Sequence, residues 1–235
     1  MINRSARLPG LVALLVAAPA FAGEGPQIGL QVGYGFWNTR ALHDKLQGTD
    51  AVGKQLADQL TDPLNMGDGG TYILQLGYNI MGHVAVEAQV TVHPWYLLDT
   101  FTDSTGSHAK RGLFGVGSGI VTWYPLQSLM RPDRTYDFSL YGGIGYGLFG
   151  GGKPFELGMD GMVSEFGGTA EIYVRPWLSI GITPRLYLLQ MQRFIVNFNT
   201  RDSGGAIYVP NASGGWFFAT TASFILHLSP VQQPM

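Results

Sequence analysis

The sequence predicts an all-β fold, an eight-stranded antiparallel transmembrane β-barrel with long external loops and short periplasmic turns. Three observations support this prediction. Eight segments alternate apolar residues with polar or small ones at every second position, as β-strands do. Each has about 9–13 residues, the length that a tilted strand needs to cross a bilayer. All of the tryptophans lie at the ends of these segments.

The chain begins with a predicted secretory signal peptide, residues 1–22. Arg4 and Arg7 precede a short apolar stretch, and the sequence AFA ending at Ala22 is an A-x-A cleavage site. The apolar stretch is too short to span a bilayer comfortably as an anchor. We therefore expect an exported protein whose remaining residues, 23–235, form one barrel domain.

Composition argues against several classes of protein. The chain has no Cys, so an exported fold must be stabilised without disulfides. Without the two arginines of the signal peptide it has 12 basic and 16 acidic residues and no basic patch, which argues against nucleic acid as a partner. Glycine is unusually frequent, with 34 of 235 residues, and many glycines fall on one face of the alternating segments. Past the signal peptide no run of about 18 apolar residues exists, so no transmembrane helix is predicted.

The first three segments alternate most regularly. Residues 27–36 (QIGLQVGYGF) place Ile, Leu, Val, Tyr and Phe on one side and only Gln and Gly on the other. Residues 71–80 (TYILQLGYNI) and 84–92 (VAVEAQVTV) repeat this pattern. In a membrane barrel the apolar side faces lipid.

The other five segments are less uniform. Residues 113–124 (LFGVGSGIVTWY) are rich in glycine and can be assigned in either phase. Residues 178–189 (LSIGITPRLYLL) contain Pro184, which removes one ladder hydrogen bond, so we expect a bulge there. The remaining segments are 138–149 (FSLYGGIGYGLF), 166–175 (FGGTAEIYVR) and 216–228 (WFFATTASFILHL).

The connections between these segments alternate in length. With an even number of strands both ends of the domain lie on the same side, so the long connections all fall on the opposite, external side. The predicted long connections are 37–70, 93–112, 150–165 and 190–215, and the predicted periplasmic ones are 81–83, 125–137 and 176–177.

The tryptophans form the predicted aromatic girdles. An aromatic ring with a polar N–H is well solvated at a membrane interface, and barrels carry such residues at both interfaces. The girdle residues are Trp37, Trp95, Trp123, Trp177 and Trp216.

These features resemble the small eight-stranded outer-membrane barrels of Gram-negative bacteria, the OmpA-type and OmpX-type family. The signal peptide, the eight strands and the last strand carry the resemblance; residues 217–228 (FFATTASFILHL) put Phe218, Phe224 and Leu226 on one face. The family usually ends on an aromatic residue, whereas SPVQQPM follows here. The resemblance implies an outer-membrane location, contact with lipid and lipopolysaccharide, and insertion by the barrel-assembly machinery.

Four charged residues are predicted to form a network inside the barrel: Glu87, Glu171, Arg175 and Arg185. The strand with Glu87 faces the strand with Arg185 across the lumen, and a tight turn places Glu171 opposite or diagonal to Arg185. The lumen of an eight-stranded barrel is just wide enough for side chains to fill. The network therefore either fills the lumen or gates a narrow pore.

No enzymatic activity, metal or cofactor is predicted. His227 and Ser229 have the His-x-Ser spacing that one barrel enzyme, a lipid A deacylase, uses. They fall at the periplasmic end, whereas lipopolysaccharide lies in the outer leaflet, and no orienting carboxylate is evident. The histidines also lack the i, i+4 spacing of a metal site on one element.

We therefore expect a structural or interaction role in which the external loops bind a partner or a surface. Residues 41–60 are predicted to form one or two short amphipathic helices, and 190–215 mix aromatic residues with Asn and Gly. Two alternatives stay open. One is a narrow porin-like channel, and the other is the barrel subunit of an envelope-spanning complex for adhesion, secretion or surface motility.

Overall fold

The computed structural model describes residues 25–38, 69–80, 83–103, 106–126, 135–151, 155–198, 206–208 and 215–229. The predicted signal peptide and the predicted helices of 41–60 lie outside them. No helix within these ranges is long and apolar enough to cross a membrane. The strands are β1 (Gly25–Asn38), β2 (Gly69–Ile80), β3 (Val84–Asp103), β4 (Gly106–Trp123), β5 (Tyr136–Gly151), β6 (Phe155–Arg175), β7 (Leu178–Phe198), β8 (Ala206–Tyr208) and β9 (Gly215–His227).

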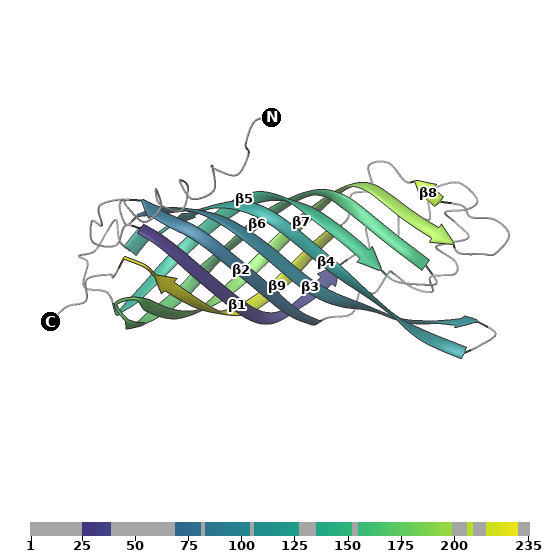
Figure 1. The fold of residues 1–235 in the computed structure, drawn as a ribbon, viewed down its shortest axis with the longest axis horizontal. Coiled ribbons are helices and arrows are strands. Elements are labelled where there is room, and N and C mark those ends of the chain that lie inside the picture. Colours follow the sequence, from purple (N-terminus) through teal and green to yellow (C-terminus); the bar gives the residue numbers. More distant parts are fainter. Residues whose placement is uncertain are drawn as a thin grey trace, which may run out of the picture.

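Eight of these strands close into a barrel in which every pairing is antiparallel (Figure 1). Each barrel strand pairs with its neighbours in the chain, and β1 closes the ring by pairing with β9. The short β8 adds to the end of β7, outside the ring. The predicted eight-stranded barrel is confirmed.

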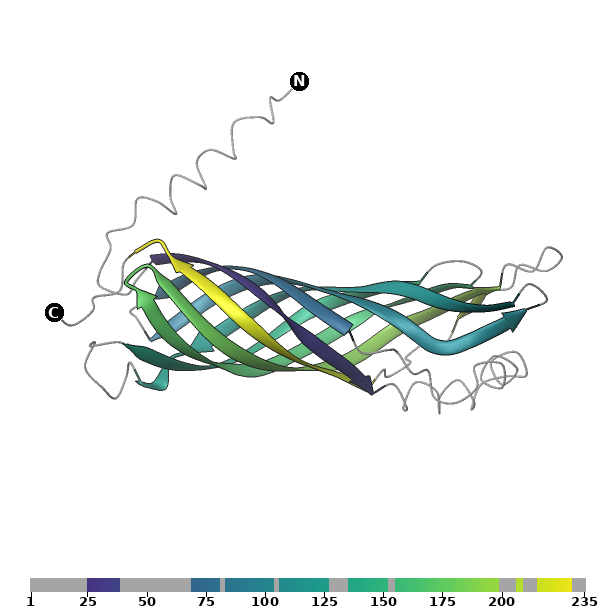
Figure 2. The same ribbon diagram turned by 90° about the horizontal axis from the view of Figure 1, so that it is seen from below.

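The register sets the tilt of the strands. A path of paired residues that starts at Ile28 and crosses all eight strands returns to β1 at Asn38, ten residues further along. Ten residues at about 3.3 Å each, against eight strands about 4.8 Å apart, correspond to a tilt of about 40°. This tilt is visible in both ribbon views (Figures 1 and 2).

The two faces of the barrel wall have the predicted character. In β1, Leu30 is 54% exposed on the outside, whereas Gln31 is 1% exposed on the inside. The ambiguous strand β4 turns Phe114 and Ile120 inward and Val121 outward. A side chain on the outer face of such a wall is exposed in the isolated chain and lies against lipid in a membrane.

The strands at the end opposite the N-terminus of β1 are longer than predicted. Residues 93–112, expected as a loop, mostly extend the β3–β4 hairpin, which projects beyond the barrel wall in Figures 1 and 2. Strands β6 and β7 likewise include much of 150–165 and 190–198. The alternation of apolar residues stops where the wall would leave the bilayer, but backbone pairing continues, so the sequence pattern underestimates strand length there.

The predicted bulge at Pro184 is wrong. The pairs Gly167–Arg185 and Ala170–Ile182 keep a single register on either side of it, although the pairs between them are missing. The lost ladder contact is bridged by the side chains of Thr169 and Thr183, whose hydroxyl oxygens are 3.0 Å apart. Proline removes one donor but needs no additional residue, so the strand stays in register.

Candidate functional site: the packed interior of the barrel

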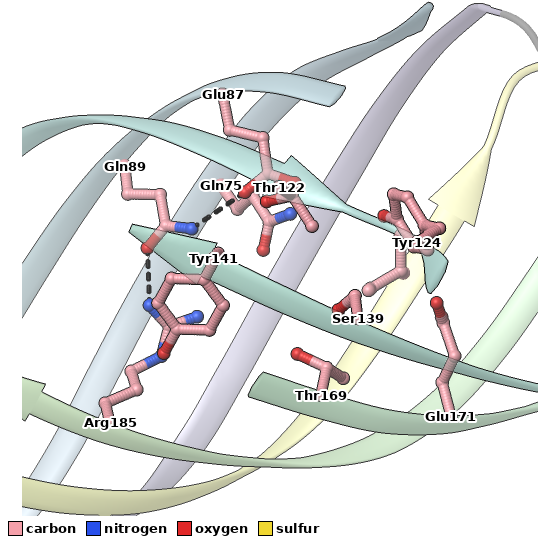
Figure 3. Close-up of a pocket in the computed structure, with 11 residues that line it drawn as sticks. Gln75, Glu87, Gln89, Thr122, Tyr124, Ser139, Tyr141, Thr169, Glu171 and Arg185 are labelled. Carbon is pink, nitrogen blue, oxygen red and sulfur yellow. Dashed lines mark hydrogen bonds between the residues drawn. The ribbon is translucent and has the colours of Figure 1, made fainter. Parts of the chain in front are cut away.

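The centre of the lumen is organised around Arg185, which β7 points inward and which is 1% exposed. Its guanidinium forms an ion pair with Glu165 of β6, itself fully buried. It also donates to Gln31 Oε1 at 2.8 and 3.2 Å and to Gln89 Oε1 at 2.6 Å. Its charge lies 4.9 Å from the centre of the Tyr141 ring (Figure 3). Arginine only donates hydrogen bonds, so a ring of acceptors is the arrangement that its burial requires.

Glu87 joins this network through an amide. Because Gln89 Oε1 accepts from Arg185, its Nε2 is the group that donates to Glu87 Oε2, at 3.0 Å. Figure 3 shows the two bonds in sequence. Gln27 Nε2 donates to the other carboxylate oxygen of Glu87, also at 3.0 Å. The structure thus places Glu87 and Arg185 in one network, in which Gln89 separates the two charges.

The other two predicted members lie elsewhere. Glu171 pairs across the sheet with Gly181, and its carboxylate accepts from Ser179 at 2.5 Å, not from Arg185. Arg175 is exposed at the end of β6, because the register shifts between Tyr173 and Arg175 and turns the side chain away from the lumen. The predicted placements of Glu171 beside Arg185 and of Arg175 inside the barrel are wrong.

Glu165 is the partner that sequence reasoning missed. It falls in 150–165, which was expected to be a loop, since Ser164 on the outer face interrupts the apolar alternation. The signal that could have found it is the inward phase of β6, which continues from Thr169 back through Glu165 to Val163. Diagonal pairing then puts Glu165 next to Arg185.

At the end of the barrel where β1 begins and β9 ends, His227 does not use Ser229 as its partner. His227 Nε2 lies 3.0 Å from the hydroxyl of Ser179, which donates to Glu171. Ser179 is fully buried between the two. In a nucleophilic triad the histidine lies between the hydroxyl and the carboxylate and the hydroxyl meets substrate. Here the hydroxyl is in the middle, and this order is suited to holding strands together.

A layer of aromatic rings closes the lumen above Arg185, at the end opposite the chain termini. The Trp37 ring lies 4.4 Å from Phe217, 4.7 Å from Phe114 and 5.4 Å from His93, measured between ring centres. Tyr187 lies 5.3 Å from Phe217. All five side chains are buried.

Trp37 is therefore not a girdle residue. Its position in the strand, seven residues after Leu30, gives it the inward phase, and the aromatic neighbours exclude it from the outer surface. Of the other predicted girdle residues, Trp123 and Trp177 are about half exposed on the outside. Trp216 packs against the ring of Phe36, and the side chain of Trp95 lies outside the described residues.

The described part of the interior contains a small cavity. This cavity lies beside Arg185 and has a volume of about 10 Å³, about what a single water molecule needs. All but one of the side chains that line it carry a polar group: Gln75, Glu87, Gln89, Thr122, Tyr124, Ser139, Tyr141, Thr169, Glu171, Arg185 and Ile225.

The outer surface is the reverse of the interior. Among the described strand residues whose side chains point outward, none between the two rims carries a charge. The outward residues include Ile144 at 65%, Ile182 at 61% and Leu148 at 60% exposure. A contiguous apolar belt of this size on a closed barrel is a lipid-facing surface.

No protein-family model matches the sequence, and comparison with curated proteins finds no match. Comparison with solved structures finds outer-membrane barrels. Neisserial surface protein A superposes with a TM-score of 0.53 and 7% identity, over 86% of this chain and 97% of that one. The outer membrane protein OprG from Pseudomonas aeruginosa superposes with a TM-score of 0.51 and 10% identity, over 88% and 98%.

The chain has the fold of the small outer-membrane β-barrels. A further match, to a major outer membrane protein from Thermus thermophilus, has a TM-score of 0.48 with 14% identity and covers 86% of this chain and 99% of that one. At these identities the likeness concerns the fold, so the role of this barrel must be argued from its own interior and rim.

Proposed function

We propose that the protein is an outer-membrane β-barrel that does not conduct ions and that presents extended external hairpins to a binding partner. The packed interior is the observation that carries this proposal. Arg185 with its acceptors and the layer of five aromatic rings occupy the lumen, and the cavity beside Arg185 has room for about one water. The wall then serves as an anchor for what lies outside the membrane.

The β3–β4 hairpin is the element that supports binding at the external end. Strand β1 begins and β9 ends at the opposite end of the barrel, which in an even-stranded barrel is the periplasmic side. Within the described strands, β3 beyond His93 has no pairing with β2, and β4 before Gly112 has none with β5. This ribbon therefore offers strand edges on both sides, to which an extended segment of a partner can add.

Shortening this ribbon tests the proposed binding. Residues 98–109 are replaced by an Asn-Gly turn that joins Leu97 to Lys110, a pair already in register. We expect the shortened barrel to fold, as followed by gel mobility with and without heating, and to lose its cross-linked envelope partners. A matched variant lacking residues 41–60 reports on a second external connection. Retention of every partner in both variants would contradict binding through external segments.

A gated narrow channel is the second candidate, favoured by the buried ion pair that Arg185 and Glu165 of neighbouring strands form at the centre of the lumen. The two candidates differ in planar bilayers. The proposed function predicts no single-channel steps for the purified wild type. A gated channel predicts steps that grow when Arg185→Ala removes the central side chain. Silence in both would exclude the channel, and regular steps from the wild type would contradict the closed barrel.

Location and wider assembly are part of the same proposal. The apolar belt, the A-x-A site at residue 22 and the likeness to outer-membrane barrels support an outer-membrane location with lipid and lipopolysaccharide as neighbours. Insertion would then use the barrel-assembly machinery. The envelope partners of the cross-linking experiment decide between a barrel that acts alone and a subunit of an envelope-spanning complex.

A further inference from the structure

Arg175 is an exposed cation at the rim of the barrel where β1 begins and β9 ends. It is the last residue of β6, and a two-residue turn joins it to β7. Its guanidinium makes no ion pair or hydrogen bond with any described residue. The charge is therefore available to a group outside the described part of the chain.

A bulge at the end of β6 turns Arg175 to the outer face of the wall. The register with β7 shifts between Tyr173 and Arg175, and Val174 is the additional residue. Arg175 then pairs with Leu178, which has the outward phase of Ile180, a residue 39% exposed on the outer face. Residues opposite each other in an antiparallel pair share one face of the sheet. Arg175 thus lies on the same side of the wall as the apolar belt.

Outward aromatic residues mark the level of Arg175 as a membrane interface. Trp177, in the turn beside it, is 48% exposed, and Tyr136 of the neighbouring strand β5 is 64% exposed. Trp123, where β4 ends at the same rim, is 47% exposed. Aromatic rings that carry a polar group gather at the level of the lipid headgroups. Arg175 is therefore placed at headgroup level, at the edge of the apolar belt.

The turn that carries Arg175 is tied to strands on both sides. The backbone N–H of His227 donates to the carbonyl oxygen of Trp177 at 2.9 Å. The backbone N–H of Tyr173 donates to the carbonyl oxygen of Thr135, also at 2.9 Å. A cation on a fixed backbone loses less conformational freedom when it binds a ligand than one on a mobile loop.

Charge and position together favour the phosphate group of a lipid as the ligand. In an even-stranded barrel this rim is the periplasmic one, and the periplasmic leaflet of an outer membrane consists of phospholipids. A planar guanidinium can donate two parallel hydrogen bonds to a phosphate. The nearest described carboxylates, Asp137 and Glu171, are buried on the inner face, so no described acidic side chain opposes an anion on the outside.

We propose that Arg175 binds the phosphate of an anionic phospholipid at the periplasmic rim, beside the girdle residues Trp177 and Tyr136. The lipid would then be a preferred neighbour of the β6–β7 turn. This inference rests on the proposed membrane location, but it does not depend on the external hairpins or on the identity of any protein partner.

Native mass spectrometry of the full chain tests the proposal. The protein is refolded into detergent micelles that contain equal amounts of phosphatidylglycerol and phosphatidylcholine, and the lipids that stay bound are identified by mass. We expect about a fivefold preference for phosphatidylglycerol, the selectivity that one arginine gives toward an anionic lipid. Equal retention of the two lipids would overturn the proposal. Release of phosphatidylglycerol by inorganic phosphate, but not by NaCl of the same ionic strength, would indicate a site for free phosphate and would also overturn it.

Three variants locate the site. Arg175→Gln removes the charge and is expected to abolish the preference, whereas Arg175→Lys keeps the charge and should retain most of it. His83→Gln changes an exposed residue in the turn before β3 at the same rim, and it is expected to leave the preference unchanged.

Gel mobility with and without heating reports separately whether each variant forms the barrel. A folded Arg175→Gln barrel that still prefers phosphatidylglycerol would contradict this site and leave the proposed membrane barrel intact. A wild type without a heat-dependent shift would instead count against the membrane barrel on which the inference rests.

Discussion

A single buried side chain, Arg185, determines which of its neighbours must be polar. Its five N–H donors have to be satisfied away from water, and Glu165, Gln31 and Gln89 supply the acceptors from three different strands. A buried charge pair of this kind is retained only when both partners are present, because either partner alone is an uncompensated charge.

Replacing the two partners together is therefore expected to be milder than replacing one. Arg185→Met leaves Glu165 buried without its cation and should destabilise the barrel by about 3–5 kcal/mol. The double variant with Glu165→Met should recover at least about 1 kcal/mol of that loss. Urea unfolding in lipid vesicles measures both, with the outward Tyr34→Phe, expected within about 0.5 kcal/mol of the wild type, as the control. A double variant less stable than Arg185→Met would contradict the pairing.

The residues of the site were predictable only in part, for a physical reason. Glu87 and Arg185 lie in segments whose alternation determines the inward phase, so their place in the lumen follows from the sequence. Which carboxylate pairs with Arg185 depends on the register between neighbouring strands. The alternation within one strand carries no information on that register. Glu171 and Glu165 have the same phase six residues apart, and only the register selects Glu165.

At the scale of the strands, close backbone approach explains part of the glycine content. A Cβ on Gly33 would lie 2.0 Å from the carbonyl oxygen of Thr220 in β9, the strand that closes the barrel. Gly117 has nothing within 4 Å of the same position. The first glycine is required by the seam between β1 and β9, whereas the second only leaves the outer surface smooth.

These two glycines form a matched test. Gly33→Ala must push β1 away from β9 and should cost about 1–3 kcal/mol. Gly117→Ala should change the free energy of unfolding by less than about 0.5 kcal/mol. Urea midpoints, together with the fraction of chain that folds into vesicles, measure the difference. Equal midpoints would mean that the seam tolerates the added methyl group.

The strands themselves were predictable where one face meets lipid and the other a polar lumen. The pattern identified all eight, but it ended β3 at 92 and began β6 at 166, well inside their real bounds. Beyond the bilayer both faces of a strand are solvated, so nothing selects apolar residues and the alternation fades. The aromatic layer around Trp37 was missed for a related reason, since a large apolar ring inside the lumen breaks the rule that the interior is polar.

The molecule as a whole is a closed barrel wall with two faces of opposite character. Closure satisfies every strand edge along the wall, which is the condition for spanning a membrane with strands. The outer face is apolar, and the described inner face carries the hydrogen-bonded network around Arg185 and the aromatic layer. The proposed function at the rim requires this arrangement.

Spin labels on the outer face test most directly whether the barrel wall spans a membrane. The chain has no Cys, so one introduced cysteine carries one label. In lipid vesicles each label should be relaxed strongly by oxygen and weakly by a water-soluble nickel chelate, whereas a label at Arg175, exposed at the turn, should show the reverse. The positions are Leu30, Leu74, Val90, Ile144, Ile182 and Phe224, all about half exposed or more. Relaxation by the nickel chelate at these positions as strong as at Arg175 would contradict a membrane-spanning barrel.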